Sequence, residues 1–384
     1  IQDLIDENQV NSNNISSYLS SQIYDLVKNV DTIGNGSLEQ YITEPTLSSN
    51  SIKISLKSDV GRYKFKTSSL TNILITSNTI SLNSITLYTP PTPSPVNWFT
   101  WNDRIITGLS NLGQNATKIV FPSITNGINS NAFSNNKNIT SFDFSYSNVT
   151  FIGNSSFSNT QISKINLPNS LTSIGTSAFS NCVNLDQIII PDTVTSIGTS
   201  AFSNCKSLTT IQLPKNLQYI SESTFSNSGL SSIELPDSIE SFGAMAFYAC
   251  NNLKYIKLPK SLTTLNPSSS GNYFGYCRAL ETVVVNEGLT TIGYAMFNRC
   301  TSLKKINIPD SVTTIGDWAF SGCSKLEEIT LPNSINTFGK HIFALDTTSE
   351  FQDLPITNLI VYVNSAQVKE KLSKVFSGTI INLG

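Results

Sequence analysis

The side chains of this sequence best suited to chemistry are six cysteines, and each stands three residues after a phenylalanine. They are Cys182, Cys205, Cys250, Cys277, Cys300 and Cys323. In an extracellular protein six cysteines could form three disulfides. Because all six recur at one position of a repeating unit, their side chains should point in parallel into one interior, whereas a disulfide needs two side chains that face each other. We therefore expect buried free thiols that pack as small apolar groups, with an oxidised pair or a metal site as alternatives.

The one histidine, His341, lies in the segment FGKHIF, at the position that Ser177 and Ser200 fill in two nearly identical units. No second histidine lies near it, which argues against a Cys/His nucleophile and against a histidine-based metal site. We expect a structural or surface role for His341.

Other catalytic patterns are missing from the sequence, including the G-x-S-x-G elbow, the phosphate loop and the acidic calcium loop. Asp103, Asp143 and Glu234 could in principle contribute to a carboxylate pair for glycoside hydrolysis, but they belong to different units. The sequence therefore predicts a protein that is not an enzyme and that holds no cofactor and no metal.

A repeat of about 23 residues must position these side chains. Residues 171–193 read LTSIGTSAFSNCVNLDQIIIPDT, and residues 194–216 read VTSIGTSAFSNCKSLTTIQLPKN. The repeat begins near Ile105 and runs to about Leu345, with two units one residue short and one unit lengthened by NPSSSG at 266–271. Repeats of this length are typical of solenoids.

Each unit has a mechanical interpretation. Ile188 and Ile190 alternate with polar or exposed positions, as in a short strand with one buried face. Pro191 ends this strand, Gly175 allows a backbone turn, and Phe179 fills the interior. Because one unit cannot bury its own apolar side, the units must stack.

The unit L-T-S-I-G-x-x-A-F-x-x-C-x-x-L-x-x-I-x-L-P, as in residues 171–191, closely resembles the bacterial surface-antigen (BspA-type) leucine-rich repeats. Residues 101–123 resemble the first unit of that family, and residues 359–372 resemble its closing strand and helix. The resemblance implies a leucine-rich-repeat solenoid, β-rich with short turns and 3-10 segments, over residues 98–384. It also implies a secreted or cell-surface adhesin, although a fold alone does not fix a ligand.

The part before the solenoid is polar and divides into three segments. Apolar residues at Ile15, Leu19, Ile23, Leu26, Val30 and Ile33 predict a helical segment within residues 1–50. That helix either packs on its own chain or forms a coiled coil that makes a homo-oligomer through residues 15–33. Residues 51–88 predict a small all-β module of four short strands, in the segments SIKISLKS, RYKFK, TNILITS and NSITLY. Residues 89–97 predict a proline-rich linker.

Composition excludes some partners. The chain of 384 residues has 24 basic and 26 acidic residues and a net charge of −2, which gives no electrostatic footprint for nucleic acid or for an anionic membrane. The sequence contains no run of 18 apolar residues, so it predicts no membrane-spanning helix. The first residues, IQDLIDENQV, do not look like a signal peptide, so localisation rests on the resemblance.

The surface that remains for binding is the outward side of the stacked strands, which we expect to form a concave face. Tyr255 with Val284 is the strongest anchor candidate, because buried aromatics dominate interface energy. The candidates on this face are Gln187, Ile189, Thr210, Gln212, Glu234, Tyr255, Lys257, Thr282, Val284, Lys305 and Asn307. The inserted segment offers a second contact region, with Asn266, Ser269, Asn272 and Tyr273. The plain alternative is that all of these are solvated strand residues.

These observations favour a non-enzymatic recognition or adhesion protein, secreted or on the cell surface, that binds a protein or glycan on a host or neighbouring cell. The alternative is the receptor-binding tip of an oligomeric, phage-type fibre with an N-terminal coiled-coil stalk.

Overall fold

The computed structural model describes residues 93–265, 271–345, 356 and 358–384, together with the backbone of four strands nearer the N-terminus. The chain divides into two compact units, residues 1–90 and residues 91–384. The helix expected within residues 1–50 lies outside the described residues, since only Thr46–Ser48 of that range is described.

In the first unit, four strands form an antiparallel sheet in the order β1-β2-β4-β3. The strands are β1 (Thr46–Ser48), β2 (Ser51–Ser55), β3 (Ile73–Thr76) and β4 (Thr79–Asn83). Of the segments expected to be strands, SIKISLKS contains β2 and TNILITS contains β3. β4 comes before most of the expected segment NSITLY, and RYKFK lies outside the described residues.

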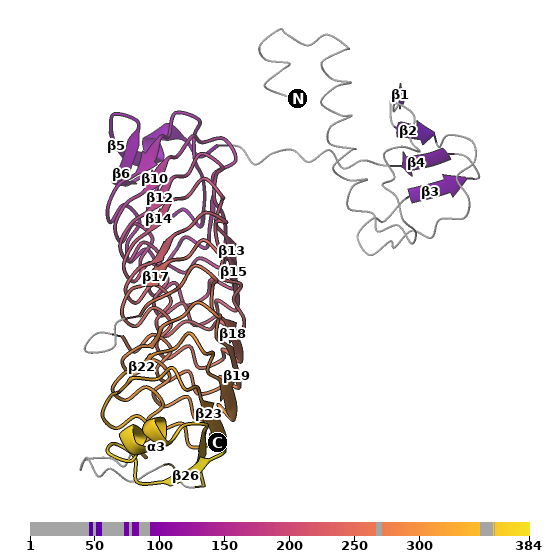
Figure 1. Ribbon diagram of the computed structural model, residues 1–384. Coiled ribbons are helices and arrows are strands. Elements are labelled where there is room, and N and C mark those ends of the chain that lie inside the picture. Colours follow the sequence, from indigo (N-terminus) through magenta and orange to yellow (C-terminus); the bar gives the residue numbers. More distant parts are fainter. Residues whose placement is uncertain are drawn as a thin grey trace. The chain divides into compact units, whose positions relative to one another are not determined.

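The second unit is the leucine-rich-repeat solenoid that the repeat predicts, with about 11 turns (Figure 1). On one side, short strands with one buried central residue stack in parallel. They are β7 (Lys118–Val120), β9 (Ser141–Asp143), β11 (Lys164–Asn166), β13 (Gln187–Ile189), β15 (Thr210–Gln212), β18 (Tyr255–Lys257), β19 (Thr282–Val284), β21 (Lys305–Asn307) and β23 (Glu328–Leu331). We call the outward surface of these strands, with residues 232–234 in the turn between β15 and β18, the strand face.

Two-residue strands form a second parallel ladder after the strand-ending turn of each unit. They are β8 (Gly127–Ile128), β10 (Phe151–Ile152), β12 (Ser173–Ile174), β14 (Ser196–Ile197), β16 (Tyr219–Ile220), β17 (Ser241–Phe242), β20 (Thr291–Ile292), β22 (Thr314–Ile315) and β24 (Thr337–Phe338).

Both ends of the solenoid are closed. The 3-10 helix η2 (Val96–Trp98) leads into β5 (Phe99–Asn102), which pairs antiparallel with β6 (Ile105–Leu109). At the other end lie the expected closing strand and helix, β25 (Ile360–Val363) and α3 (Ala366–Leu372), and β26 (Thr379–Asn382) then extends the sheet past β25. Within the segment expected as a linker, Ser94 is buried, and its backbone N–H donates to the Val120 carbonyl at 2.9 Å.

The third side of each turn is built around a buried phenylalanine, and we call the five residues centred on it the phenylalanine turn. Ten such rings, from Phe133 to Phe343, stack along the solenoid with neighbouring centroids 5.1–5.9 Å apart and planes tilted by 5–20°. In nine of the ten turns the residues two before and two after the ring hold positive φ, as at Ser177 (54°) and Asn181 (59°). Asparagine tolerates this left-handed backbone better than most residues, which explains its frequency there.

The six cysteines are buried free thiols, as expected. Each thiol lies close to the carbonyl of the phenylalanine one turn before, for example Cys205 Sγ to the Phe179 oxygen at 3.1 Å. Burial raises the pKa of Cys182 to about 11 and that of Cys323 to about 12. In the two short units Thr160 and Ser228 fill the cysteine position, and their hydroxyls contact the next thiol at 3.4 Å and 3.3 Å.

The repeated glycine has a different role from the one expected. Gly175 has no positive φ, so freedom to turn is not what it supplies. A Cβ at Gly175 would lie 2.7 Å from the backbone nitrogen of Asn154, and one at Gly198 would lie 2.5 Å from the backbone nitrogen of Thr176. The glycine is needed because successive turns approach each other here at backbone distance.

Candidate binding surface

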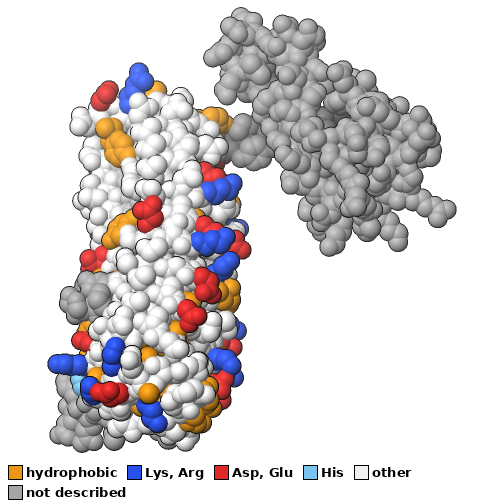
Figure 2. Space-filling view, in the orientation of Figure 1, with side chains coloured by type: hydrophobic (Ala, Val, Ile, Leu, Met, Phe, Trp, Pro, Cys, Tyr) orange, Lys and Arg blue, Asp and Glu red, His pale blue; other side chains and the backbone are white. Residues whose placement is uncertain are grey.

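The strand face carries most of the residues that the sequence nominated for binding. On β13, β15, β18, β19 and β21 the central residue is buried and both flanking residues are exposed. Glu234 is also exposed, but residues 232–234 form no strand. Figure 2 shows that Lys, Arg, Asp and Glu side chains gather along the side of the solenoid where Figure 1 places β13 to β23, while the surface facing the viewer is largely uncharged.

Ion pairs link successive turns along this side. Lys215 Nζ lies 3.4 Å from Asp192, and the backbone N–H of Lys215 donates to the same carboxylate at 2.9 Å. Lys260 repeats both contacts with Asp237, at 3.2 Å each. The backbone N–H and the ammonium group hold the pKa of Asp192 and of Asp237 below the usual range. Because all four side chains are exposed, these pairs add little to stability and mainly order the surface.

The ladder of the strand face is open at residues 232–235. After three of the strands the next residue donates to the following turn: Phe121 N–H to the Asp143 carbonyl at 2.8 Å, Ile190 N–H to the Gln212 carbonyl at 3.0 Å and Leu258 N–H to the Val284 carbonyl at 2.9 Å. Ser231 N–H still donates to the Thr209 carbonyl at 3.1 Å. Within the described residues, no backbone hydrogen bond joins Leu213 to the turn that follows it. The two turns are therefore joined at the start of the strand segment and part at its end.

We attribute this opening to the shortened unit. The turn from Phe225 to Leu230 lacks one residue, and Gly229 lies against the preceding turn, with its N–H donating to the Cys205 carbonyl at 3.0 Å. A Cβ at Gly229 would lie 2.1 Å from the Lys206 carbonyl oxygen. The other short unit, before β11, behaves differently: β11 stays paired with β9 before it, and the sheet order breaks only between β11 and β13.

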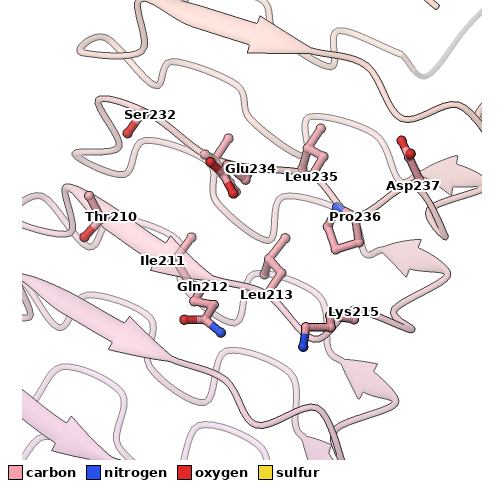
Figure 3. Close-up of a pocket in the computed structure, with 11 residues that line it drawn as sticks. Thr210, Ile211, Gln212, Leu213, Lys215, Ser232, Glu234, Leu235, Pro236 and Asp237 are labelled. Atoms are coloured by element: carbon pink, nitrogen blue, oxygen red, sulfur yellow. The ribbon is translucent and has the colours of Figure 1, made fainter. Parts of the chain in front are cut away.

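The opening forms a hollow of about 570 Å³ in the strand face (Figure 3). One side of the hollow is formed by β15 and the residues after it, and the other side by the segment that follows Gly229. The lining residues are Thr210, Ile211, Gln212, Leu213 and Lys215 on the first side and Ser232, Ile233, Glu234, Leu235, Pro236 and Asp237 on the second. Ile211 and Ile233 are buried, so the hollow combines an apolar floor with a polar rim.

Four polar side chains at the rim, Thr210, Gln212, Ser232 and Glu234, have no hydrogen-bond or ion-pair partner among the described residues. Lys215 and Asp237 are held by their ion pairs, whereas neither a hydrogen bond nor an ion pair engages the side chains of Gln212 and Glu234. A carboxylate and an amide beside an apolar floor suit a long cationic side chain, which can lay its methylenes on the floor and donate to the carboxylate.

The two proposed anchors, Tyr255 and Val284, are 46% and 39% exposed and lie on neighbouring strands. They are diagonal rather than opposite, because Tyr255 pairs with Thr282 and Lys257 pairs with Val284. Diagonal side chains on adjacent strands remain within reach of an aromatic ring.

The second contact region needs a correction at Tyr273. This side chain is only 3% exposed and lies 6.2 Å from the ring of Phe242, so it belongs to the core and not to an exposed contact. Its position directly before the stacked Phe274 explains the burial. Asn272 is half-buried with φ of 50°, and Asn266 and Ser269 lie outside the described residues.

Sequence reasoning missed Lys215 and Asp237 and the hollow itself. The signal for them was the shortened unit at Phe225 to Leu230, which is visible in the spacing of the repeat. His341 lies in a phenylalanine turn, half-buried, with its ring stacked on Trp318 at 4.3 Å.

The described residues contain neither a metal-binding cluster nor a membrane-spanning helix. No group of three or more His, Cys, Asp or Glu side chains there is arranged to hold a metal ion. None of the helices described has both the length and the apolar character that crossing a membrane requires.

Comparison with known proteins gives a family and several solved relatives. The model of the BspA type leucine rich repeat region matches six copies, over residues 110–191, 172–272 and 268–375. No curated protein sequence matches this chain.

The solved relatives are bacterial. A leucine-rich repeat protein from Bacteroides ovatus is 21% identical over 90% of this chain and 98% of its own, with a TM-score of 0.36. The pneumococcal vaccine antigen PcpA is 19% identical over 90% and 100%, with a TM-score of 0.46. A leucine-rich cell surface protein from Faecalibacterium prausnitzii is 21% identical over 76% and 99%, with a TM-score of 0.37. With its repeat matched across residues 110–375, this chain belongs to the BspA-type leucine-rich repeat family.

Proposed function

We propose that this protein is a non-enzymatic recognition protein of the bacterial surface, and that its strand face binds a protein on a host or neighbouring cell. The observation that carries the proposal is the hollow between β15 and residues 232–237, where Gln212 and Glu234 have no partner among the described residues. A lysine or arginine side chain of the partner would fill it.

The surroundings of the hollow support a protein partner. Tyr255, on the next turn, is the exposed aromatic of the face, and Ile189, 64% exposed, lies on β13 before the hollow. Interfaces of this kind combine a few aromatic or apolar anchors with a polar rim. The alternative is that the residues of the strand face contact only solvent. In that case neither the hollow nor the exposed side chains of Tyr255 and Ile189 would contact a partner.

The chemistry of the hollow supports binding rather than catalysis. Glu234 and Asp237 both line it, as a hydrolase pair might. A general acid needs a raised pKa, whereas the contacts from Lys260 hold the pKa of Asp237 below its usual range. Asp237 is thus suited to a fixed charge at the rim.

The fibre-tip alternative rests on the apolar stripe from Ile15 to Ile33, which lies outside the described residues. It would place the same strand face at the end of an oligomeric stalk and does not change the binding residues.

The test is solid-phase binding of the purified protein to immobilised extracellular-matrix proteins and cell-surface glycans. We expect at least one protein to be bound, and the variant Glu234→Gln to bind it at least tenfold more weakly. Glu240→Gln, an exposed glutamate outside the hollow, is the matched control. A folded protein that binds nothing on the panel, or equal binding by Glu234→Gln, would contradict the proposal.

A further inference from the structure

The phenylalanine turns change character halfway along the solenoid. In the five turns from Phe133 to Phe225, every left-handed position holds serine or asparagine. From the turn of Phe247 onward the same positions hold Met245, Tyr276, Arg299, Trp318 and His341 among others, with φ between 55° and 61°. Bulky side chains are rare in this conformation, and residues held in it cluster at functional sites.

The backbone of the turn does not require these residues. Asn227 N–H donates to the next turn at 2.7 Å, and Tyr276 N–H and Arg299 N–H make the equivalent bonds at the same distance. In the first half the asparagines also bond to each other, as Asn227 does to Asn204 at 2.8 Å. The second half of the solenoid lacks these bonds between asparagine side chains but keeps the backbone hydrogen bonds between successive turns.

Four of the replacing and neighbouring side chains form one cluster. The rings of Tyr248 and Tyr276 lie 5.2 Å apart at an angle of 53°. Arg299 places its guanidinium 4.8 Å from the centroid of the Tyr276 ring, and Arg278 places its own at 5.9 Å. Both arginines oppose the rise that burial causes in the pKa of Tyr248, so the four side chains are within electrostatic reach of one another.

The cluster is unusual for this chain in charge as well as in shape. The sequence has four arginines, Arg62, Arg104, Arg278 and Arg299, and two of them meet at Tyr276. No carboxylate of the described residues forms an ion pair with Arg278. Arg278 is exposed, and Tyr248, Tyr276 and Arg299 are half-buried at the surface.

We propose that Tyr248, Tyr276, Arg278 and Arg299 form a second binding site, for a saccharide that carries a carboxylate. The planar guanidinium fork matches a carboxylate in a bidentate manner, and tyrosine rings offer a flat apolar surface with a polar end, which suits the C–H face of a sugar ring. Tyr248, Tyr276 and Arg299 of this site lie in phenylalanine turns and Arg278 lies two residues after one, and the site uses none of the residues of the hollow.

The test is calorimetric titration of the full-length protein with 3′-sialyllactose, with trigalacturonic acid and with lactose as the neutral control. We expect one of the two acidic saccharides to bind and lactose to bind at least tenfold more weakly; which one binds separates a sialic acid from a uronic acid. Equal binding of lactose, or no binding of either acid, would overturn the proposal.

The variants Tyr276→Asn and Arg278→Gln separate binding from structure. Asparagine is the residue that this left-handed position holds in the first half, so we expect Tyr276→Asn to keep or raise the Tm while weakening saccharide binding at least tenfold. Arg278→Gln should weaken binding with an unchanged Tm, and Asn181→Ser, in an equivalent position of the first half, should change neither. A Tm several degrees lower for Tyr276→Asn, or binding unchanged in both variants, would show that the cluster serves only the fold.

Discussion

At the scale of the residue, the cysteine position shows what the solenoid interior demands. A small and weakly polar group fits three residues after the stacked phenylalanine, where it meets the carbonyl of the previous turn. In the short units Thr160 and Ser228 place a hydroxyl at this position, and each hydroxyl contacts the thiol of the following turn. The position therefore favours a small group that can donate a hydrogen bond in a buried place.

The thiols predict a distinct pH dependence. Because burial raises the pKa of Cys182 to about 11 and of Cys323 to about 12, the folded state favours the protonated thiol. An unfolded thiol ionises near ~8.5, so the stabilisation is complete below that pH and is lost as the pH rises towards the folded pKa values. Urea unfolding under reducing conditions should give a falling free energy of unfolding from pH 8.5 to pH 10.5.

The same burial predicts that a thiol reagent modifies the cysteines at pH 8 only in urea. Rapid modification of the folded protein, or stability that does not change between pH 8.5 and pH 10.5, would show that the thiols are accessible or carry no such linkage.

At the scale of the element, the contact between successive turns decides which residues are tolerated. We predict that Gly198→Ala lowers the free energy of unfolding by about 2–3 kcal/mol, because its Cβ would lie 2.5 Å from the backbone nitrogen of Thr176. Gly288→Ala is the matched control, since its nearest neighbour would be a side-chain oxygen of Asn286 at 3.3 Å. Equal losses in the two variants, measured by urea unfolding, would refute the account of turn spacing.

The elements also show how far the sequence could predict the structure. The repeat gave the strand positions, the buried phenylalanines and the free thiols, because each depends on a pattern that recurs every 22 or 23 residues. The hollow occurs at one unit and does not recur, so no repeated position marks it. The missing residue before Leu230 shows which unit is altered, but the spacing alone does not show that the neighbouring turns part there. Tyr273 was misjudged because the insertion hides that it directly precedes a stacked phenylalanine.

At the scale of the whole molecule, a net charge of −2 on 384 residues leaves little general attraction for a charged partner. Recognition through Glu234 should therefore be local, and exposed ionic contacts weaken as salt screens them. We predict that binding to the protein found on the panel weakens several-fold between 50 mM and 500 mM NaCl. Glu234→Gln should lose most of this salt dependence and Glu240→Gln should retain it; identical salt profiles for all three proteins would exclude Glu234 from the interface.

The most direct test of the central claim is hydrogen exchange of the full-length protein, followed by mass spectrometry. In the free protein, peptides covering residues 210–216 and 232–238 should exchange faster than peptides covering 187–193 and 255–261, because Leu213 lacks the backbone bond that Ile190 and Leu258 make. Adding the partner found on the panel should slow exchange in the first two peptides. Equal protection of all four peptides in the free protein, or no slowing at the hollow when the partner binds, would contradict the account.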